Sequence, residues 1–272
     1  MKGSIAKGAF VYTALVGLAI MSLVPFFWML FTSLKPLSEV ESGSFLPKDW
    51  RPGNFQEVFA QIRFGRYYLN SIFVASWVTY LTCLTSALAA YSFTRLEWKS
   101  RDFLFRVYLA TRMIPGVVTQ IPGFAIIVNL GMLDTYAALI VPSAFTAFGV
   151  FLLRQVMLGV PKALDEAARI DGANSWQILW EIVLPLSRSG IITLAIFSFM
   201  GNYGSLIGPL IMLKSDGLRT LPVGLTFFDS KYGSQTNLLM AASVMSIIPP
   251  LILFIVGQKH LVKGIQLGAV KG

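Results

Sequence analysis

The sequence predicts an all-α membrane protein with six transmembrane helices and a cytoplasmic helical loop between the fourth and fifth. Of its 272 residues, 55% are hydrophobic and only 13% are charged, whereas soluble domains carry about 25% charged residues. Six long intervals contain no charged residue at all. The charged residues collect instead in the segments between these intervals, as expected when the intervals lie in lipid.

Each charge-free interval is long enough to cross a bilayer, which takes about 20 mostly apolar residues. Asp134 separates the third interval from the fourth, so that hairpin is expected to be tight. The first interval is too long for the apolar region of a cleaved signal peptide, and we expect it to be retained. We therefore treat 1–272 as one transmembrane domain, with spans at 9–33, 68–93, 104–129, 135–153, 189–213 and 236–258.

The distribution of Lys and Arg predicts that both termini are cytoplasmic. With that orientation, the cytoplasmic segments hold more basic residues than the outer ones, and most outer ones fall in the single long loop 35–66. Short cytoplasmic segments are the ones enriched in Lys and Arg. Loop 35–66 would be extracytoplasmic, either as a solvated linker or as a contact surface for an outer partner, with a short amphipathic helix near 55–62.

The sequence of the cytoplasmic loop 154–188 predicts two short helices around an Asp-Gly turn. Pro161 suits the start of the first helix, and Asp165 can pair with Arg169 one turn later. Gly172 accepts the left-handed conformation that ends a helix. Asn174 or Ser175 can cap the second helix, which should end before Pro185. Because the loop mixes acidic and basic residues, a protein partner is favoured over a helical hairpin lying on lipid.

Several motifs resemble one known family. "EAARIDGA" at 166–173 followed by "IVLP" at 182–185 is similar to the signature loop of permease subunits of ABC importers. The resemblance to maltose-type carbohydrate permeases extends over roughly residues 9 to 272. It includes "MIPGVVTQIP" at 113–122, "LGMLDTYAALIVP" at 130–142, "TLPVGL" at 220–225, "LLMAASVMSIIPPLILF" at 238–254 and the tail "GIQLGAVKG".

The resemblance implies a pore-forming subunit in a bacterial or archaeal cytoplasmic membrane. Its loop would carry the coupling helix, which docks on a separate ATP-hydrolysing subunit through Glu166, Ala167, Ala168, Asp171 and Gly172. The implied partners are ATP-binding cassette ATPase subunits, a second homologous permease subunit with six or more spans, and an extracytoplasmic solute-binding protein. The implied cargo is a sugar, and ATP and Mg²⁺ would be bound by the ATPase partners.

Polar residues in the fifth span are candidates for the substrate path. Within "IFSFMGNYGSLIGPLIML", Asn202, Tyr203 and Ser205 stand beside Gly201 and Gly204. Amides, hydroxyls and aromatic rings suit sugar binding, and glycines can distort a helix so that its backbone faces a cavity. The alternative is an interhelical hydrogen bond, with glycines that permit close packing.

The sequence argues against other chemistry. It contains no G-x-x-x-x-G-K-[ST] phosphate loop, so no cofactor is expected in this chain. A single Cys and a single His form no metal cluster, and no catalytic set stands out. Arg112 either lines the cavity or extends to the cytoplasmic interface, with the second favoured. Pro115 and Pro122 are expected to kink the third span.

Two other functions remain as alternatives. An ABC permease for a charged solute such as a polyamine or phosphate should place compensating charges in the spans. Arg112 is the one candidate, which argues against this alternative. An ion-coupled secondary transporter commonly buries acidic residues along its pathway, and the predicted spans have none. A channel would leave the helical loop without a role. Nucleic acid is not an expected partner, because the basic residues follow span ends.

Overall fold

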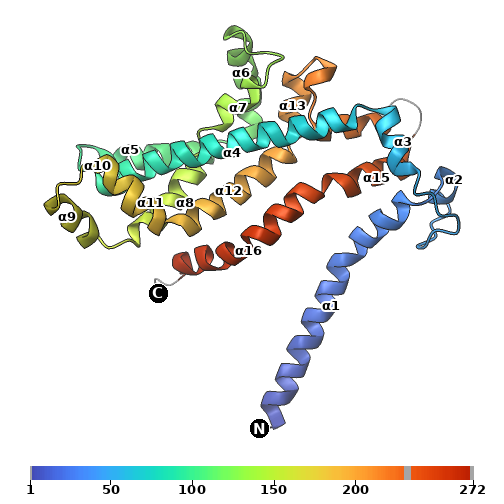
Figure 1. Ribbon diagram of the computed structural model, residues 1–272, viewed down its shortest axis with the longest axis horizontal. Coiled ribbons are helices and arrows are strands. Elements are labelled where there is room, and N and C mark those ends of the chain that lie inside the picture. Colours follow the sequence, from blue (N-terminus) through green and yellow to red (C-terminus); the bar gives the residue numbers. More distant parts are fainter. Residues whose placement is uncertain (1, 230–233, 270–272) are drawn as a thin grey trace. The chain divides into compact units, whose positions relative to one another are not determined.

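The computed structural model describes the backbone of residues 2–229 and 234–269, and the side chains of 10–229 and 234–259. The regular elements in this part of the chain are helices (Figure 1). The longer ones are α1 (Lys2–Ser33), α3 (Asn54–Gln61), α4 (Phe64–Arg95), α5 (Arg101–Ala110), α6 (Gly116–Asn129), α8 (Ala147–Leu158), α9 (Ala163–Ile170), α12 (Arg188–Tyr203), α15 (Thr236–Ser246) and α16 (Ile248–Ala269). The shorter ones are α2 (Leu37–Val40), α7 (Ala137–Ser143), α10 (Ser175–Gln177), α11 (Leu184–Leu186), α13 (Ile207–Met212) and α14 (Leu221–Leu225), with the turns η1 (Thr111–Met113), η2 (Ile178–Val183), η3 (Asp216–Leu218) and η4 (Thr226–Phe228).

Three predicted spans coincide with long apolar helices. The segments Phe10–Ser33, Phe64–Arg95 and Thr236–Lys259 are each long and apolar enough to cross a membrane. They match the predicted spans 9–33, 68–93 and 236–258. The described side chains do not include the whole tail motif 264–272 or the basic residues Lys2, Lys7, Lys231, His260, Lys263 and Lys271.

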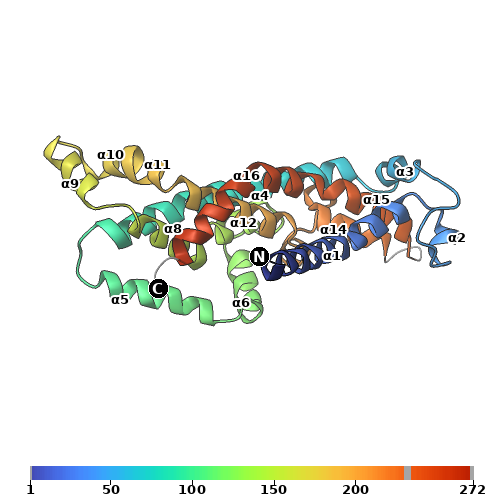
Figure 2. The same ribbon diagram turned by 90° about the horizontal axis from the view of Figure 1, so that it is seen from below.

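The other three predicted spans are broken. Helices α5 and α6 meet at 100°, so the predicted span 104–129 is not one continuous helix (Figure 2). The break is at Pro115: Ile114 before it is extended, as proline requires of the preceding residue. Pro122, in contrast, lies inside the continuous helix α6. The expected kink is therefore present at the first proline, and the helix continues through the second.

The breaks in the fourth and fifth predicted spans have no proline at the joint. Helices α7 and α8 are bent by 40° around residues 144–146. Helix α12 ends at Tyr203 with Gly204 as its C-cap, before α13 begins. At its other end α12 forms a 77° bend with the loop helices Ser175–Leu186. Length and composition allow up to six spans if each bent pair is one span, and the count of six stays a prediction.

The chain divides into two compact units, of which residues 67–220 and 249–272 form the larger. Its core joins α4, α8 and α12 to the loop helices through Ala90, Leu153, Ile178, Leu179 and Leu194. Backbones approach closely here because of two glycines. A Cβ on Gly149 would lie 3.2 Å from Leu194, and one on Gly190 would lie 2.7 Å from Val156.

Residues 1–66 and 221–248 form the other unit, in which α1 contacts α15. Its loop 35–66 is folded around buried polar groups. The amide of Asn54 donates to the carbonyls of Ser33 and Lys35, at 2.8 Å each. The ammonium group of Lys35, 1% exposed, donates to the carbonyl of Ser44. Helix α3 occupies 54–61, close to the predicted amphipathic segment.

Candidate functional site

The helical loop is built around a left-handed turn at Gly172. Helix α9 ends at Ile170, and Gly172 has φ +86°. The N–H of Ala173 donates to the carbonyl of Ala168 at 2.9 Å, the six-residue closure of a Schellman motif. Ala168 and Ala173 both pack against the core, which is the apolar contact that accompanies this motif. The predicted turn is confirmed, although α9 begins at Ala163, two residues after Pro161.

The second loop helix begins with a capping box. The side chain of Asn174 accepts hydrogen bonds from the N–H groups of Trp176 and Gln177, and the Gln177 side chain accepts from the N–H of Asn174. Of the two predicted caps, Asn174 is therefore the one used. The expected end before Pro185 is wrong, because the helix continues to Leu186 through the π-helical turn η2. The wider turn gives the proline ring room against the preceding carbonyls.

Asp165 attaches α9 to the core of the larger unit. Its Oδ2 lies 3.4 Å from Nε of Arg95, and the two side chains are 10% and 3% exposed. The Nη2 of Arg95 also donates to the carbonyls of Met157 at 3.0 Å and Val160 at 2.7 Å. Arg95 thus joins the last turn of α4, the carboxyl end of α8 and helix α9. The predicted surface pair of Asp165 with Arg169 is wrong, because Asp165 turns inward to a buried cation.

The outer face of the loop is exposed and partly apolar. The predicted docking residues Glu166, Ala167, Asp171 and Gly172 are exposed, whereas Ala168 is half-buried against the core and helps to seat α9. Ile170 is 86% exposed, and Trp176 is 60% exposed. The tryptophan was missed in the sequence analysis, where the second helix was considered only for its caps. Figure 1 shows α9 and α10 at the end of α4 where α5 begins.

Hydroxyl groups of α4 donate hydrogen bonds to backbone carbonyls at the break between α7 and α8. The hydroxyl of Thr82 donates to the carbonyl of Ser143 at 3.0 Å, and that of Thr85 donates to the carbonyl of Ala144 at 2.6 Å. A helix interrupted within a membrane needs such partners, since its freed carbonyls have no water nearby. The sequence analysis missed these threonines, because their partners lie about 60 positions further along the chain.

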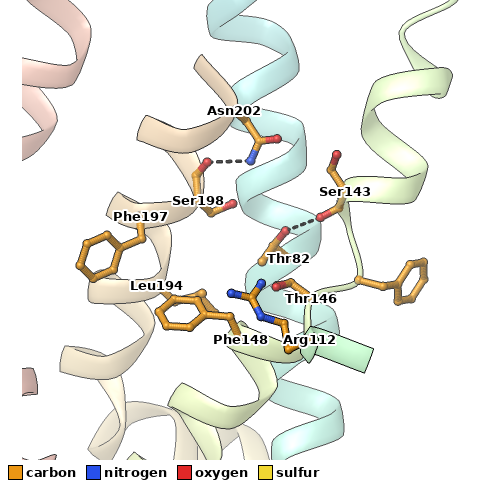
Figure 3. Close-up of a pocket in the computed structure, with 10 residues that line it drawn as sticks. Thr82, Arg112, Ser143, Thr146, Phe148, Leu194, Phe197, Ser198 and Asn202 are labelled. Carbon is orange, nitrogen blue, oxygen red and sulfur yellow. Dashed lines mark hydrogen bonds between the residues drawn. The ribbon is translucent and has the colours of Figure 1, made fainter. Parts of the chain in front are cut away.

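Two adjoining cavities follow these breaks. The larger, of ≈ 340 Å³, is shown in Figure 3 and is lined by Thr82, Arg112, Ser143, Phe145, Thr146, Phe148, Leu194, Phe197, Ser198 and Asn202. The smaller, of ≈ 120 Å³, is lined by Ser205, Pro209 and residues of α4, α7 and α13. Ser143 and Asn202 line both. The two cavities therefore adjoin along α4, between two broken helices, and the lining of the larger is the more polar of the two.

Of the residues predicted to line the substrate path, some line the cavities and others do not. Asn202 and Ser205 line the cavities, and the Asn202 amide donates to the carbonyl of Ser198 at 2.7 Å (Figure 3). Tyr203 is buried and stacks on Phe199 with ring centroids 5.6 Å apart. Gly204 ends α12, and a Cβ on Gly201 would meet no atom within 4 Å. The glycine-rich segment does interrupt the helix, as expected.

Arg112 lines the larger cavity, the less favoured of its two predicted positions. Its guanidinium carbon lies 5.9 Å from the ring centroid of Phe148, and Figure 3 shows the group turned into the pocket. Among the described residues, no cluster of three or more His, Cys, Asp or Glu side chains is suited to a metal.

Long apolar helices, cavities between broken helices and an exposed helical loop are compatible with a membrane transport subunit. Residues 82–266 match the family of binding-protein-dependent transport system inner membrane components. The chain is 32% identical over 260 residues to the arabinooligosaccharides transport system permease protein AraQ of Halalkalibacterium halodurans, covering 94% of this chain and 93% of that protein. It is 31% identical over 260 residues to the lactose transport system permease protein LacG of Rhizobium radiobacter, covering 96% and 95%.

The fold is similar to that of a solved importer. A chain in the crystal structure of a bacterial ABC transporter involved in the import of the acidic polysaccharide alginate superposes with a TM-score of 0.81, at 25% identity, over 92% of this chain and 95% of that one. The protein therefore belongs to the binding-protein-dependent inner membrane transport components and is an ABC transporter permease subunit.

Proposed function

We propose that this chain is the pore-forming permease subunit of an ATP-driven importer that moves a sugar or oligosaccharide across a bacterial or archaeal cytoplasmic membrane. The observation that carries the proposal is the loop at 161–185, whose exposed face is free for a partner while its inner face is fixed to the helices that line the cavities. The names of the similar permeases, for arabinooligosaccharides and lactose, support a carbohydrate as the cargo.

In this proposal the chemistry of ATP belongs to other subunits. ATP-binding cassette subunits would bind ATP and Mg²⁺ and would receive the exposed residues Glu166, Ala167, Asp171 and Gly172. A second homologous permease subunit would complete the pore, and an extracytoplasmic binding protein would deliver the sugar. Both termini would be cytoplasmic, and loop 35–66 would face the binding protein.

The contacts of Arg95 supply a route for coupling. Helix α9 is held to the carboxyl ends of α4 and α8 through Asp165 and Arg95. The same two helices carry Thr82, Thr146 and Phe148 at the wall of the larger cavity. A displacement of α9 by a closing ATPase would therefore move cavity walls directly. Binding energy drives such a change only if each ligand favours one state over the other.

The test replaces Gly172 with leucine in the assembled complex. A Cβ at this position meets no atom within 4 Å, but φ is +86°, so the variant suffers backbone strain and no clash. We expect normal membrane insertion together with the loss of ATP-driven sugar uptake. Gly131→Leu is the matched control, since Gly131 has φ +67° and equally open space outside the loop.

Uptake by Gly172→Leu equal to that by Gly131→Leu would contradict the role of the loop. Wild-type proteoliposomes that hold the ATPase and the binding protein but take up no carbohydrate on addition of ATP would contradict the sugar function itself.

A further inference from the structure

The larger cavity has one charged residue among the described residues that line it, and that residue is a cation. Arg112 shares the lining with the hydroxyl and amide groups of Thr82, Ser143, Thr146, Ser198 and Asn202, and with no carboxylate. Two of these polar groups already donate to backbone carbonyls, Thr82 to Ser143 and Asn202 to Ser198. A guanidinium placed here is thus the one strong electrostatic feature of the pocket.

The backbone places Arg112 at this wall. It lies in the 3₁₀ turn η1, immediately before the extended residue Ile114 and the 100° break between α5 and α6. The break lets the side chain turn into the cavity, where its guanidinium approaches the ring of Phe148 (Figure 3). This cation–π contact orients the group while its N–H donors remain available for a ligand.

The start of α8 adds to the same field. Helix α8 has 12 residues and begins beside the cavity, which its N-cap Thr146 and first-turn residue Phe148 both line. The amino end of a helix carries a partial positive charge that favours anions. The amino end of α8 and the guanidinium of Arg112 therefore both favour a negatively charged group in the cavity.

A cation within a membrane segment is costly unless it has a partner or a task. A neutral sugar needs only hydroxyl, amide and aromatic groups, and the pocket already offers these in Asn202, Ser143 and Phe197. We propose that the cargo is an acidic carbohydrate, and that Arg112 binds its carboxylate during passage. This proposal rests on the proposed function as a sugar importer and narrows its substrate class to uronate-containing oligosaccharides.

The test uses proteoliposomes that contain the whole importer and its purified binding protein. They are given a panel of trisaccharides of equal length, with galactotriose, maltotriose and arabinotriose as the neutral half and trigalacturonate and triglucuronate as the acidic half. ATP-driven uptake is measured for each. We expect uptake from the acidic half, and loss of that uptake when the same trisaccharide is supplied as its methyl ester.

Variants then assign the effect to the cavity. Arg112→Gln should lower uronate uptake by about tenfold or more, as expected for the loss of one charge-assisted hydrogen bond. Arg112→Lys should retain a substantial part of it. Arg106→Gln is the matched control, because Arg106 is an exposed cation of the preceding helix α5, donates to the Asp102 carbonyl and does not line the cavity.

Uptake confined to neutral trisaccharides, or equal uronate uptake by Arg112→Gln and Arg106→Gln, would overturn the acidic cargo while the sugar importer stands. If Arg112→Gln fails to assemble, the preference of the wild type and of Arg112→Lys for acidic over neutral trisaccharides still tests the proposal. The absence of ATP-driven uptake of every carbohydrate would instead count against the proposed function.

Discussion

The carboxylate of Asp165 and the guanidinium of Arg95 form a buried ion pair, with 3.4 Å between Oδ2 and Nε. The pair connects a helix of the exposed loop to the end of a long apolar helix. Because Arg95 also caps the carbonyls of Met157 and Val160, α9 cannot shift without disturbing both α4 and α8. The loop is thus a fixed extension of the helices that line the cavities.

Removal of one partner of this pair should be severe. Asp165→Asn leaves the Arg95 guanidinium buried without its counter-charge, which typically costs about 3–5 kcal/mol. We expect a markedly lower thermal midpoint of the purified chain in detergent and a loss of ATP-driven uptake. Thermal unfolding and transport measured on the same preparation check this.

Two further variants show whether loss of the Asp165–Arg95 ion pair itself causes the expected loss of stability. Asp102→Asn removes a carboxylate that is 65% exposed, and its cost should stay below about 1 kcal/mol. The double variant Arg95→Met with Asp165→Leu should be less destabilised than the sum of the single variants. Additive effects in the double variant would show that the two side chains do not interact.

A side chain at Gly149 should separate helices of the core. A Cβ there would lie 2.9 Å from Cγ2 of Thr146 and 3.2 Å from Leu194, and would also meet Ser86 of α4. We expect Gly149→Val to destabilise the chain by about 1–3 kcal/mol through overpacking. Gly123→Val is the control for helix propensity, since a Cβ at Gly123 meets nothing within 4 Å. Equal thermal midpoints for the two variants would refute the close packing.

Loop 35–66 should loosen in acid through Glu39. A hydrogen bond from the Lys48 N–H, with others from Asp49 and Ser44, holds the pKa of Glu39 below its ordinary value. A carboxylate with a lowered pKa stabilises the fold above the pKa of the unfolded chain, and this stability is lost as the pH falls through the folded value. We expect proteolysis of loop 35–66 to accelerate as the pH drops below about 4.

Glu39→Gln should make the loop susceptible already at neutral pH and remove most of the acid response. Glu41→Gln, which changes an exposed carboxylate two residues away, should behave like the wild type. An unchanged acid response in Glu39→Gln would assign the effect to another group.

The sequence predicts features that depend on local chemistry. Gly172 and Asn174 form the turn and the cap expected of them, and Pro115 breaks its helix, because left-handed backbone, capping and proline sterics act within a few residues. The three long apolar helices also follow from a local property, because each coincides with an interval of the sequence that has few or no charged residues.

The features that sequence reasoning missed depend on distant partners. The break at 144–146 lacks a helix breaker at the joint and is satisfied by Thr82 and Thr85 of another helix. Asp165 has a suitable cation four residues away, yet burial and the nearby Arg95 determine its pairing. Arg112 enters the cavity because the bend at Pro115 reorients the turn before it. Such contacts arise only once the helices are assembled.

The most direct test of the central claim is cross-linking from the exposed end of α9. Cys83 is the one cysteine of the chain, so Cys83→Ser provides a background for Ile170→Cys, a site that is 86% exposed. A photoactivated linker on this thiol, in native membranes, should yield an adduct that mass spectrometry identifies as an ABC ATPase subunit. The same linker at Leu46→Cys, a 58% exposed position in loop 35–66, should not. If the ATPase is present in the membrane but forms no adduct at Ile170, the loop is not its docking site and the coupling account is wrong.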